Sequence, residues 1–230
     1  MPLRSCSLVA KSLVPSCRRH LFRTITFTSQ NVGGWLQTFP VPEESPACYV
    51  KDLCLLFGGR CDAPEEFFKH TPWFTNVEKM ALKGNMMFPS RVVGSRETLE
   101  RSFDFSRFPR LQTVTIDLHW IQGPLHYITT ALSTLKPSTS PHLSHVHLRF
   151  TGPTCSAPYL ASGTSDLEDL GSDLRQIADE LSRIEREYEG AVKLRVFQSP
   201  DFELLDRLNV RFSFLWGWTK PHYEIVAHSS

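Results

Sequence analysis

The sequence predicts an α/β fold in which about six short parallel strands alternate with helices. The first observation is a pattern, apolar-x-x-apolar-x-apolar, that recurs six times in the 230 residues, at 22–27, 50–55, 77–82, 111–116, 143–148 and 191–196. Its last two apolar positions have the period of a strand with one buried face. The second observation is helical spacing of apolar residues between the copies. One such unit cannot bury its own apolar face, so the strands are expected to stack side by side.

The pattern is similar to that of leucine-rich repeats, whose strands form one long solvent-facing surface. The spacing here is long and irregular, with steps of 28, 27, 34, 32 and 48 residues between first positions. We therefore expect an irregular leucine-rich-repeat-like solenoid over residues 22–210. The alternative is an α/β domain whose strands are buried on one face without any repeat.

Residues 1–21 are predicted to form two short helices ahead of the first strand. Leu3, Leu8, Val9 and Leu13 fit one apolar helical face, and Pro15 suits the first turn of a second helix. The alternative is a cleaved mitochondrial leader of about 20 residues, because the segment is rich in Ser, Arg and Leu and contains no acid. The direct transition into the first strand favours the helix pair.

The segment from Leu3 to Ile25, LRSCSLVAKSLVPSCRRHLFRTI, resembles the second half of an F-box and the strand that follows it in fungal F-box-like proteins. The segments 63–80 and 142–148 are also similar to the irregular leucine-rich region of that family. Two features differ. The family's opening helix, LPxELxxxIxxxL, is absent ahead of Leu3, and Leu13 stands where the family commonly has Trp.

The resemblance implies a non-enzymatic protein-interaction module, the substrate-recognition part of an F-box subunit of a cullin-RING ubiquitin ligase. Its partners would be a target protein and a Skp-type adaptor, which F-box proteins bind through an apolar helical surface. The matching positions give the adaptor-binding candidates Leu3, Leu8, Val9, Leu13, Val14 and Pro15. The alternative is an orphan repeat-type binding or scaffold protein that binds no adaptor.

Further helices are predicted between and after the strands. Short helices are expected at 31–39 and 64–70, and a face formed by Leu125, Ile128, Leu132 and Leu135 indicates another. The clearest helix is 166–188, which we interpret as a cover for the preceding strand, with a dimeric coiled coil as the alternative. The aromatic tail, 211–230, is treated as a separate segment, and alternation over 209–216 suggests one more strand.

An aromatic cluster, Phe67, Phe68, Trp73 and Phe74, is predicted to pack in the core. A nucleic-acid stacking platform would need interleaved Lys and Arg, and only Lys69 is nearby. The formal net charge of +1 gives no indication of nucleic-acid binding either.

Composition bounds the compartment. No apolar stretch of about 18 residues is present, so no membrane span is expected. The six cysteines form no Cys-x-x-Cys pair and follow no secretory signal, which suits reduced thiols in the cytoplasm or nucleus.

The motifs of common enzymes are absent. The chain contains no Gly-x-Ser-x-Gly, no phosphate-binding Gly-rich loop and no His-Glu-x-x-His, so neither enzymatic activity nor a cofactor is expected. His142, His145 and His147 are the best metal-ligand cluster, with Asp117 as a partner if the fourth and fifth strands pair. Solvated histidines are the commoner case. Because Cys48, Cys54 and Cys61 lack zinc-finger spacing, no metal site is predicted.

The strand alternation predicts which side chains point away from the core. These side chains have mixed charges with a basic excess, which suits an acidic or polar protein partner. The candidates for a partner-binding face are Lys79, Lys83, Thr113, Thr115, Asp117, His145, His147, Arg149, Lys193 and Arg195.

Overall fold

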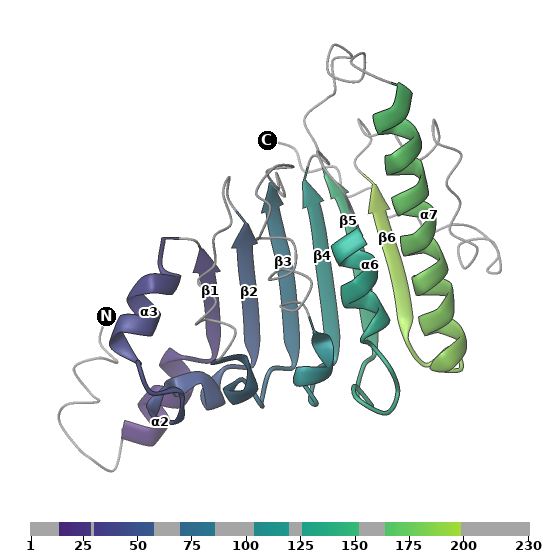
Figure 1. Cartoon of the computed structure of the whole chain (residues 1–230). Helices are drawn as coiled ribbons and strands as arrows, with labels where there is room; N and C mark the ends of the chain where they lie inside the picture. The colour runs from purple at the N-terminus through teal and green to yellow at the C-terminus, as the bar shows by residue number, and fades with distance from the viewer. Residues whose placement is uncertain are drawn as a thin grey trace.

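The computed structural model describes residues 14–28, 30–57, 70–85, 104–119, 126–151 and 164–198. These residues form an α/β fold around a parallel sheet of six strands (Figure 1). Each strand overlaps one copy of the sequence pattern, so the prediction of six parallel strands alternating with helices is confirmed. The strands are β1 (Thr24–Thr28), β2 (Asp52–Phe57), β3 (Lys79–Asn85), β4 (Thr113–His119), β5 (His145–Thr151) and β6 (Lys193–Gln198).

The spatial order of the strands is their order in the chain, β1 to β6, and each pairs with its sequence neighbours. One hydrogen-bond arrangement recurs just before the strands. The carbonyl oxygen of Lys51 accepts from the backbone amides of Glu78 and Lys79, at 2.8 and 2.9 Å. The carbonyls of Arg23, Glu78 and Gln112 accept two amides of the next unit in the same way. This repeated contact fixes the register of successive units.

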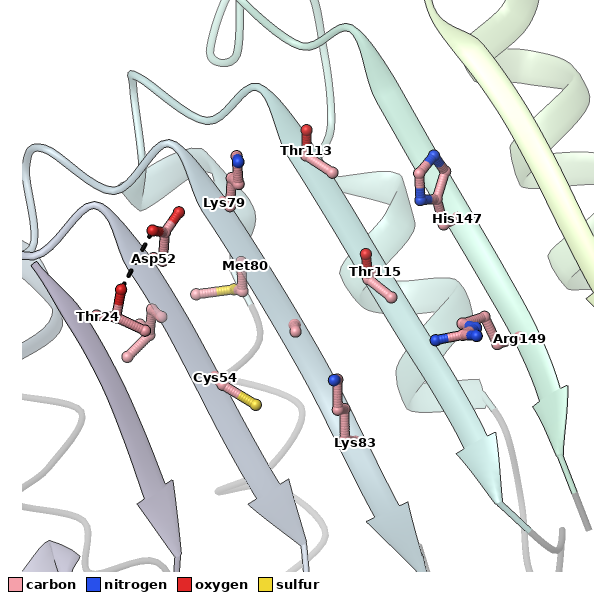
Figure 2. A pocket seen from close by; sticks show the side chains of 12 residues that line it. Thr24, Asp52, Cys54, Lys79, Met80, Lys83, Thr113, Thr115, His147 and Arg149 are labelled. Carbon is pink, nitrogen blue, oxygen red and sulfur yellow. Dashed lines mark hydrogen bonds between the residues drawn. The ribbon is translucent and has the colours of Figure 1, made fainter. Parts of the chain in front are cut away.

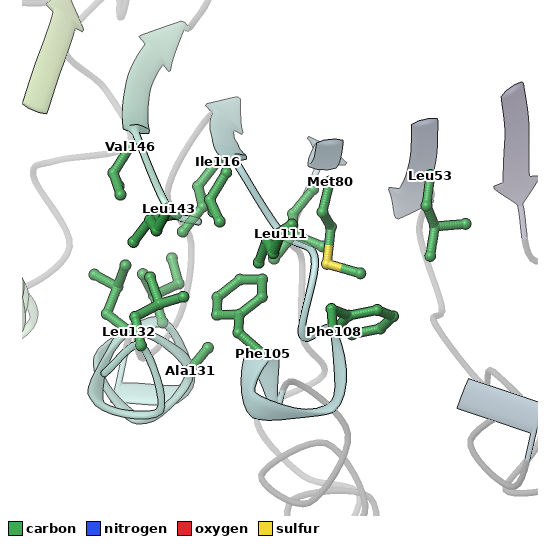
Figure 3. Packing of buried hydrophobic residues seen from close by; sticks show 14 of the residues in the cluster. Leu53, Met80, Phe105, Phe108, Leu111, Ile116, Ala131, Leu132, Leu143 and Val146 are labelled. Carbon is green, nitrogen blue, oxygen red and sulfur yellow. The ribbon is translucent and has the colours of Figure 1, made fainter. Parts of the chain in front are cut away.

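One face of the sheet packs into the hydrophobic core. The two inner rows contain the last two apolar positions of every sequence pattern, and in the four central strands most of these side chains are fully buried. Figure 3 shows Met80, Ile116 and Val146 directed toward Leu132 and Phe105 on the covering segments. The rows are Ile25, Leu53, Met80, Val114, Val146 and Leu194, and then Phe27, Leu55, Leu82, Ile116, Leu148 and Val196.

The segments that cover the core face lie on one side of the sheet (Figure 1). The α-helices among the described residues are α2 (Val14–Leu21), α3 (Val32–Thr38), α6 (His126–Ser133) and α7 (Thr164–Glu187). The helices expected at 31–39, 125–135 and 166–188 are confirmed, and α7 buries Leu174, Ile177, Leu181 and Ile184 against the core. In the same part of the chain, 3-10 turns add to the cover: η2 (Pro42–Glu44), η3 (Pro46–Tyr49), η4 (Thr71–Trp73) and η5 (Phe105–Arg107).

A tight turn precedes each unit's strand from β2 onward. The amide of the first apolar pattern residue donates to the carbonyl three residues earlier, as in Val77 to Phe74 at 3.3 Å and Leu111 to Phe108 at 3.0 Å. Phe74 and Phe108 are buried at the end of their 3-10 turns. These units therefore contain a buried turn residue as well as the strand pattern.

One sequence-based assignment is wrong. Trp73 is 37% exposed, whereas Thr71 and Phe74 are buried. In a 3-10 turn, side chains three positions apart lie above one another, so burial of Thr71 and Phe74 turns Trp73 outward.

The sixth pattern has the predicted strand, with Leu194 and Val196 in the inner rows, but its first position differs from the others because Ala191 is exposed and Val192 is buried. The left-handed residues Glu189 and Gly190, at φ 51° and 75°, end α7 just before this position.

Several predicted segments fall outside the described residues. These are the first helix of the N-terminal pair, Phe67 and Phe68 in the helix expected at 64–70, and the strand expected at 209–216 within the aromatic tail.

Candidate protein-binding face

The side chains that point away from the core form three rows across the sheet, which we name the open face. No described helix or 3-10 turn packs on it, since their buried residues belong to the core on the opposite side. The rows begin at Thr24, Thr26 and Thr28 on β1 and continue through every strand by the parallel register. The open face is therefore a continuous surface of outward side chains from six strands.

All ten residues predicted for a partner-binding face lie on the open face, on strands β3 to β6. The first row includes Lys79, Thr113, His145 and Lys193. The second includes Thr115, His147 and Arg195, and the third includes Lys83, Asp117 and Arg149. Sequence reasoning missed Thr24, Thr26, Asp52 and Cys54, which continue the rows on β1 and β2. The same alternation, applied to the first two patterns, would have found them.

A concavity of about 580 Å³ lies at the centre of the open face. Figure 2 shows Lys79, Lys83, Thr115 and Arg149 projecting from neighbouring strands around it, with helices behind the sheet. His147 lines its far side. The concavity brings together amines, a guanidinium, hydroxyls and an imidazole, which can donate to carboxylates and other anions, and the carboxylate of Asp52 also lines it.

The charges of the open face are unbalanced toward positive. Two carboxylates face five basic side chains, which are Lys79, Lys83, Arg149, Lys193 and Arg195. Asp52 accepts a hydrogen bond from the Thr24 hydroxyl at 3.3 Å. Asp117 lies between Lys83 and Arg149 in the third row. The first two rows on β5 and β6 contain basic groups only.

Burial and the positive environment both lower the pKa values of the two histidines. Burial lowers the pKa of His147, and the neighbouring His145, Arg195 and Arg149 lower it further. Burial also lowers the pKa of His145, with added contributions from Lys193 and Arg195. Both rings are therefore neutral at pH 7, and their centroids lie 5.7 Å apart in a T-shaped contact.

Cys54 is the only thiol of the three rows among the described strands. Burial raises the pKa of this thiol, and the charge of Asp117 raises it too, while Lys83 and a hydrogen bond with Thr26 lower it. The thiol is thus protonated at neutral pH. The thiolate that nucleophilic catalysis needs is disfavoured here.

The open face does not assemble the metal ligands considered from the sequence. β4 and β5 do pair, but Asp117 lies opposite Arg149 rather than opposite a histidine. His142 lies in the turn before β5. Within the described part of the chain, no group of three or more His, Cys, Asp or Glu residues is placed to hold a metal ion.

The adaptor-binding candidates fall at the start of the described residues. Val14 and Pro15 are in the first turn of α2, whereas Leu3, Leu8, Val9 and Leu13 lie outside the described residues. None of the described helices combines the length and the apolar character needed to cross a membrane.

Comparisons with known proteins identify no family and no related structure for this chain. The chain matches no protein-family model, and searches of curated proteins and of solved structures gave no significant match.

Proposed function

We propose that this protein is a non-enzymatic interaction module that binds an acidic protein partner on its open face. The observation that carries the proposal is the division of the sheet into two faces. Helices cover one face, and the other carries polar and basic side chains around a concavity, with no described element packed on it. A rigid sheet that presents alternating charged side chains suits recognition of a complementary protein surface.

Two charge-reversed variants test this proposal. Lys79→Glu with Arg195→Glu changes two exposed side chains at opposite parts of the open face. Lys136→Glu with Arg186→Glu makes the same change in net charge at exposed sites off that face, after α6 and on α7. Both pairs should fold, because exposed substitutions change stability by about 0.5 kcal/mol or less.

Quantitative affinity purification from cells of the source organism then compares the variants with the wild type. The proposal expects partners that elute with salt, are lost from the open-face variant and are retained by the matched control. Equal recovery with both variants would contradict binding on the open face.

A finer proposal follows the F-box resemblance: the module is the substrate-recognition part of a cullin-RING ubiquitin ligase. Its support is the sequence from Leu3 to Ile25 and the helix α2 that leads directly into β1. The test is recovery of a Skp-type adaptor with the wild type and its loss in Leu8→Asp or Val14→Asp. If the adaptor never copurifies, the protein is an orphan binding or scaffold module.

A further inference from the structure

The β5 and β6 end of the open face contains four basic side chains in two adjacent rows. His145 is paired in register with Lys193, and His147 with Arg195. The two imidazole rings are in contact, with centroids 5.7 Å apart and planes at 80°. Neighbouring strands in a sheet are about 4.8 Å apart, so all four side chains lie within one small patch. We name these four residues the basic quartet.

The groups that face the histidines from the adjoining strands are hydroxyl-bearing or basic. On β4 the register partners of His145 and His147 are Thr113 and Thr115. On β6 they are the two basic members of the quartet. Arg149 follows on β5, and the acid nearest in register, Asp117, lies opposite it in the third row. No described residue of the quartet's two rows on β4, β5 or β6 is acidic.

Burial holds both rings in the neutral form by lowering the pKa of each, and the nearby positive charges lower it further. A carboxylate placed over the quartet would have the opposite effect. It would favour the protonated imidazole and strengthen its own attraction to the ring.

The environment of His145 is compatible with a second proton. The Ser144 hydroxyl donates its single proton to the carbonyl of Gln112, at 3.0 Å. In the tautomer protonated at Nδ1, His145 donates to that hydroxyl, at 2.8 Å. In that tautomer the additional proton enters at Nε2, and the bond to Ser144 is retained in both states of the ring.

We propose that a carboxylate-rich segment of a partner protein docks on the basic quartet, and that His145 and His147 take up protons as it binds. This inference rests on the proposed function and names its contact point and its pH response. Because binding raises the proton affinity of the rings, linkage requires the complex to tighten as pH falls through the range in which they titrate.

A glutamate-rich peptide with a fluorescent label is the probe, and the same peptide with Gln at every Glu is the uncharged control. Binding to the full chain is measured by anisotropy at about pH 7.5 and about pH 5.5 at fixed ionic strength, a range that spans histidine titration. The expected result is affinity for the Glu peptide roughly tenfold higher at the lower pH. Calorimetry in buffers of different ionisation enthalpy should show proton uptake.

The double variant His145→Gln and His147→Gln should bind the Glu peptide at the higher pH but lose the acid enhancement. His142→Gln, in the exposed turn before β5, should keep it. The peptide's own carboxylates titrate equally in the experiments with the wild type and with each variant, so their contribution cancels when the proteins are compared.

Three results would overturn the inference. Wild-type binding that does not change with pH excludes proton uptake, and leaves the purification test of the proposed function unaffected. Absence of Glu-peptide binding at both pH values excludes the docking site. Tighter binding of single-stranded DNA than of the Glu peptide would assign the quartet to nucleic acid instead.

Discussion

Leu148 and Arg149 are adjacent residues of β5 that lie in opposite environments. Leu148 is fully buried in the core, and Arg149 lines the concavity of the open face. Leu148→Ala should lower the free energy of unfolding by about 2–5 kcal/mol, because it leaves a cavity under the sheet. Arg149→Gln should change it by about 1 kcal/mol or less. Urea unfolding measures both, and a larger loss for Arg149→Gln would mean that the two faces are reversed.

Tyr188 connects the end of α7 to the loop before β5. Its side chain is 8% exposed, and its hydroxyl donates to the carbonyl of Ser140 at 3.1 Å. That carbonyl also accepts from the amide of Leu143 at 3.1 Å, so it keeps one partner when the hydroxyl is removed. Tyr188→Phe should therefore cost only about 1 kcal/mol at neutral pH.

The stability contributed by Tyr188 should depend on alkaline pH. Burial raises its pKa from 10.0 to about 12, with Arg183 lowering it and Glu187 raising it to a smaller extent. Between these values the unfolded chain releases the phenolic proton while the folded protein retains it, so the wild type loses stability as pH rises. The deficit of Tyr188→Phe measured at neutral pH should shrink in this window. A deficit that stays constant or grows would contradict the raised pKa.

At the scale of elements, the strands and long helices were predictable because their apolar residues have a clear period. Two residues per repeat identify each inner face, and α7 buries residues at steps of three and four. The 3-10 turns were missed because three residues define no period. Phe105 and Phe108 could have been recognised as core only by their spacing from Leu111, and Trp73 looked equivalent to Phe74 for the same reason.

α7 is fastened to the segment after α6 by Arg183. Its guanidinium donates to the carbonyls of Leu132 and Leu135, at 3.0 and 3.3 Å, which lie at and just beyond the C-terminal turn of α6. It also pairs with Glu180 and Glu187 of its own helix, each at 2.7 Å. The side chain is 20% exposed, so these carbonyls and acids are partly shielded from water. The Arg183 side chain thus provides hydrogen-bond donors to carbonyls at the C-terminal end of α6 and holds α7 against that end.

Replacing Arg183 should loosen this pair of helices. Arg183→Met should lower the free energy of unfolding by about 1–3 kcal/mol, because it leaves partly buried carbonyls and acids without their donor. The stability of Arg183→Lys should fall between that of the wild type and that of Arg183→Met, since an ammonium group cannot reproduce the forked hydrogen bonds of the guanidinium. Arg175→Met, at an exposed position of the same helix, is the control and should be close to the wild type. Equal thermal stability of Arg183→Met and the control would contradict the anchoring role.

At the scale of the whole molecule, the sequence predicted which residues share a face but not which residues meet. Alternation alone assigned Asp117, His147 and Arg149 to the outer face. The neighbour of each depends on the parallel register between strands separated by about 30 residues of chain. The register placed Asp117 opposite Arg149, which disfavours the metal site considered with the histidines. It also left the basic quartet without a nearby acid in its rows, a feature that no local pattern predicts.

The sequential strand order makes the protein a nearly one-dimensional stack, in which a strand is stabilised mainly by its two neighbours. Val114 and Ile116 of β4 are fully buried between β3 and β5, whereas Ile25 of the terminal strand β1 is only partly buried. We expect the hydrogen-bonded amides of β3 and β4 to exchange with solvent roughly tenfold or more slowly than those of β1. Native-state hydrogen exchange followed by mass spectrometry measures this gradient.

Leu53→Ala removes a buried contact on β2. If each strand is stabilised mainly by its neighbours, this substitution should speed amide exchange in β1, which pairs with β2, more than in β5. Uniform protection in all six strands, or an equal effect of Leu53→Ala on β1 and β5, would instead show that the sheet opens only as one cooperative unit.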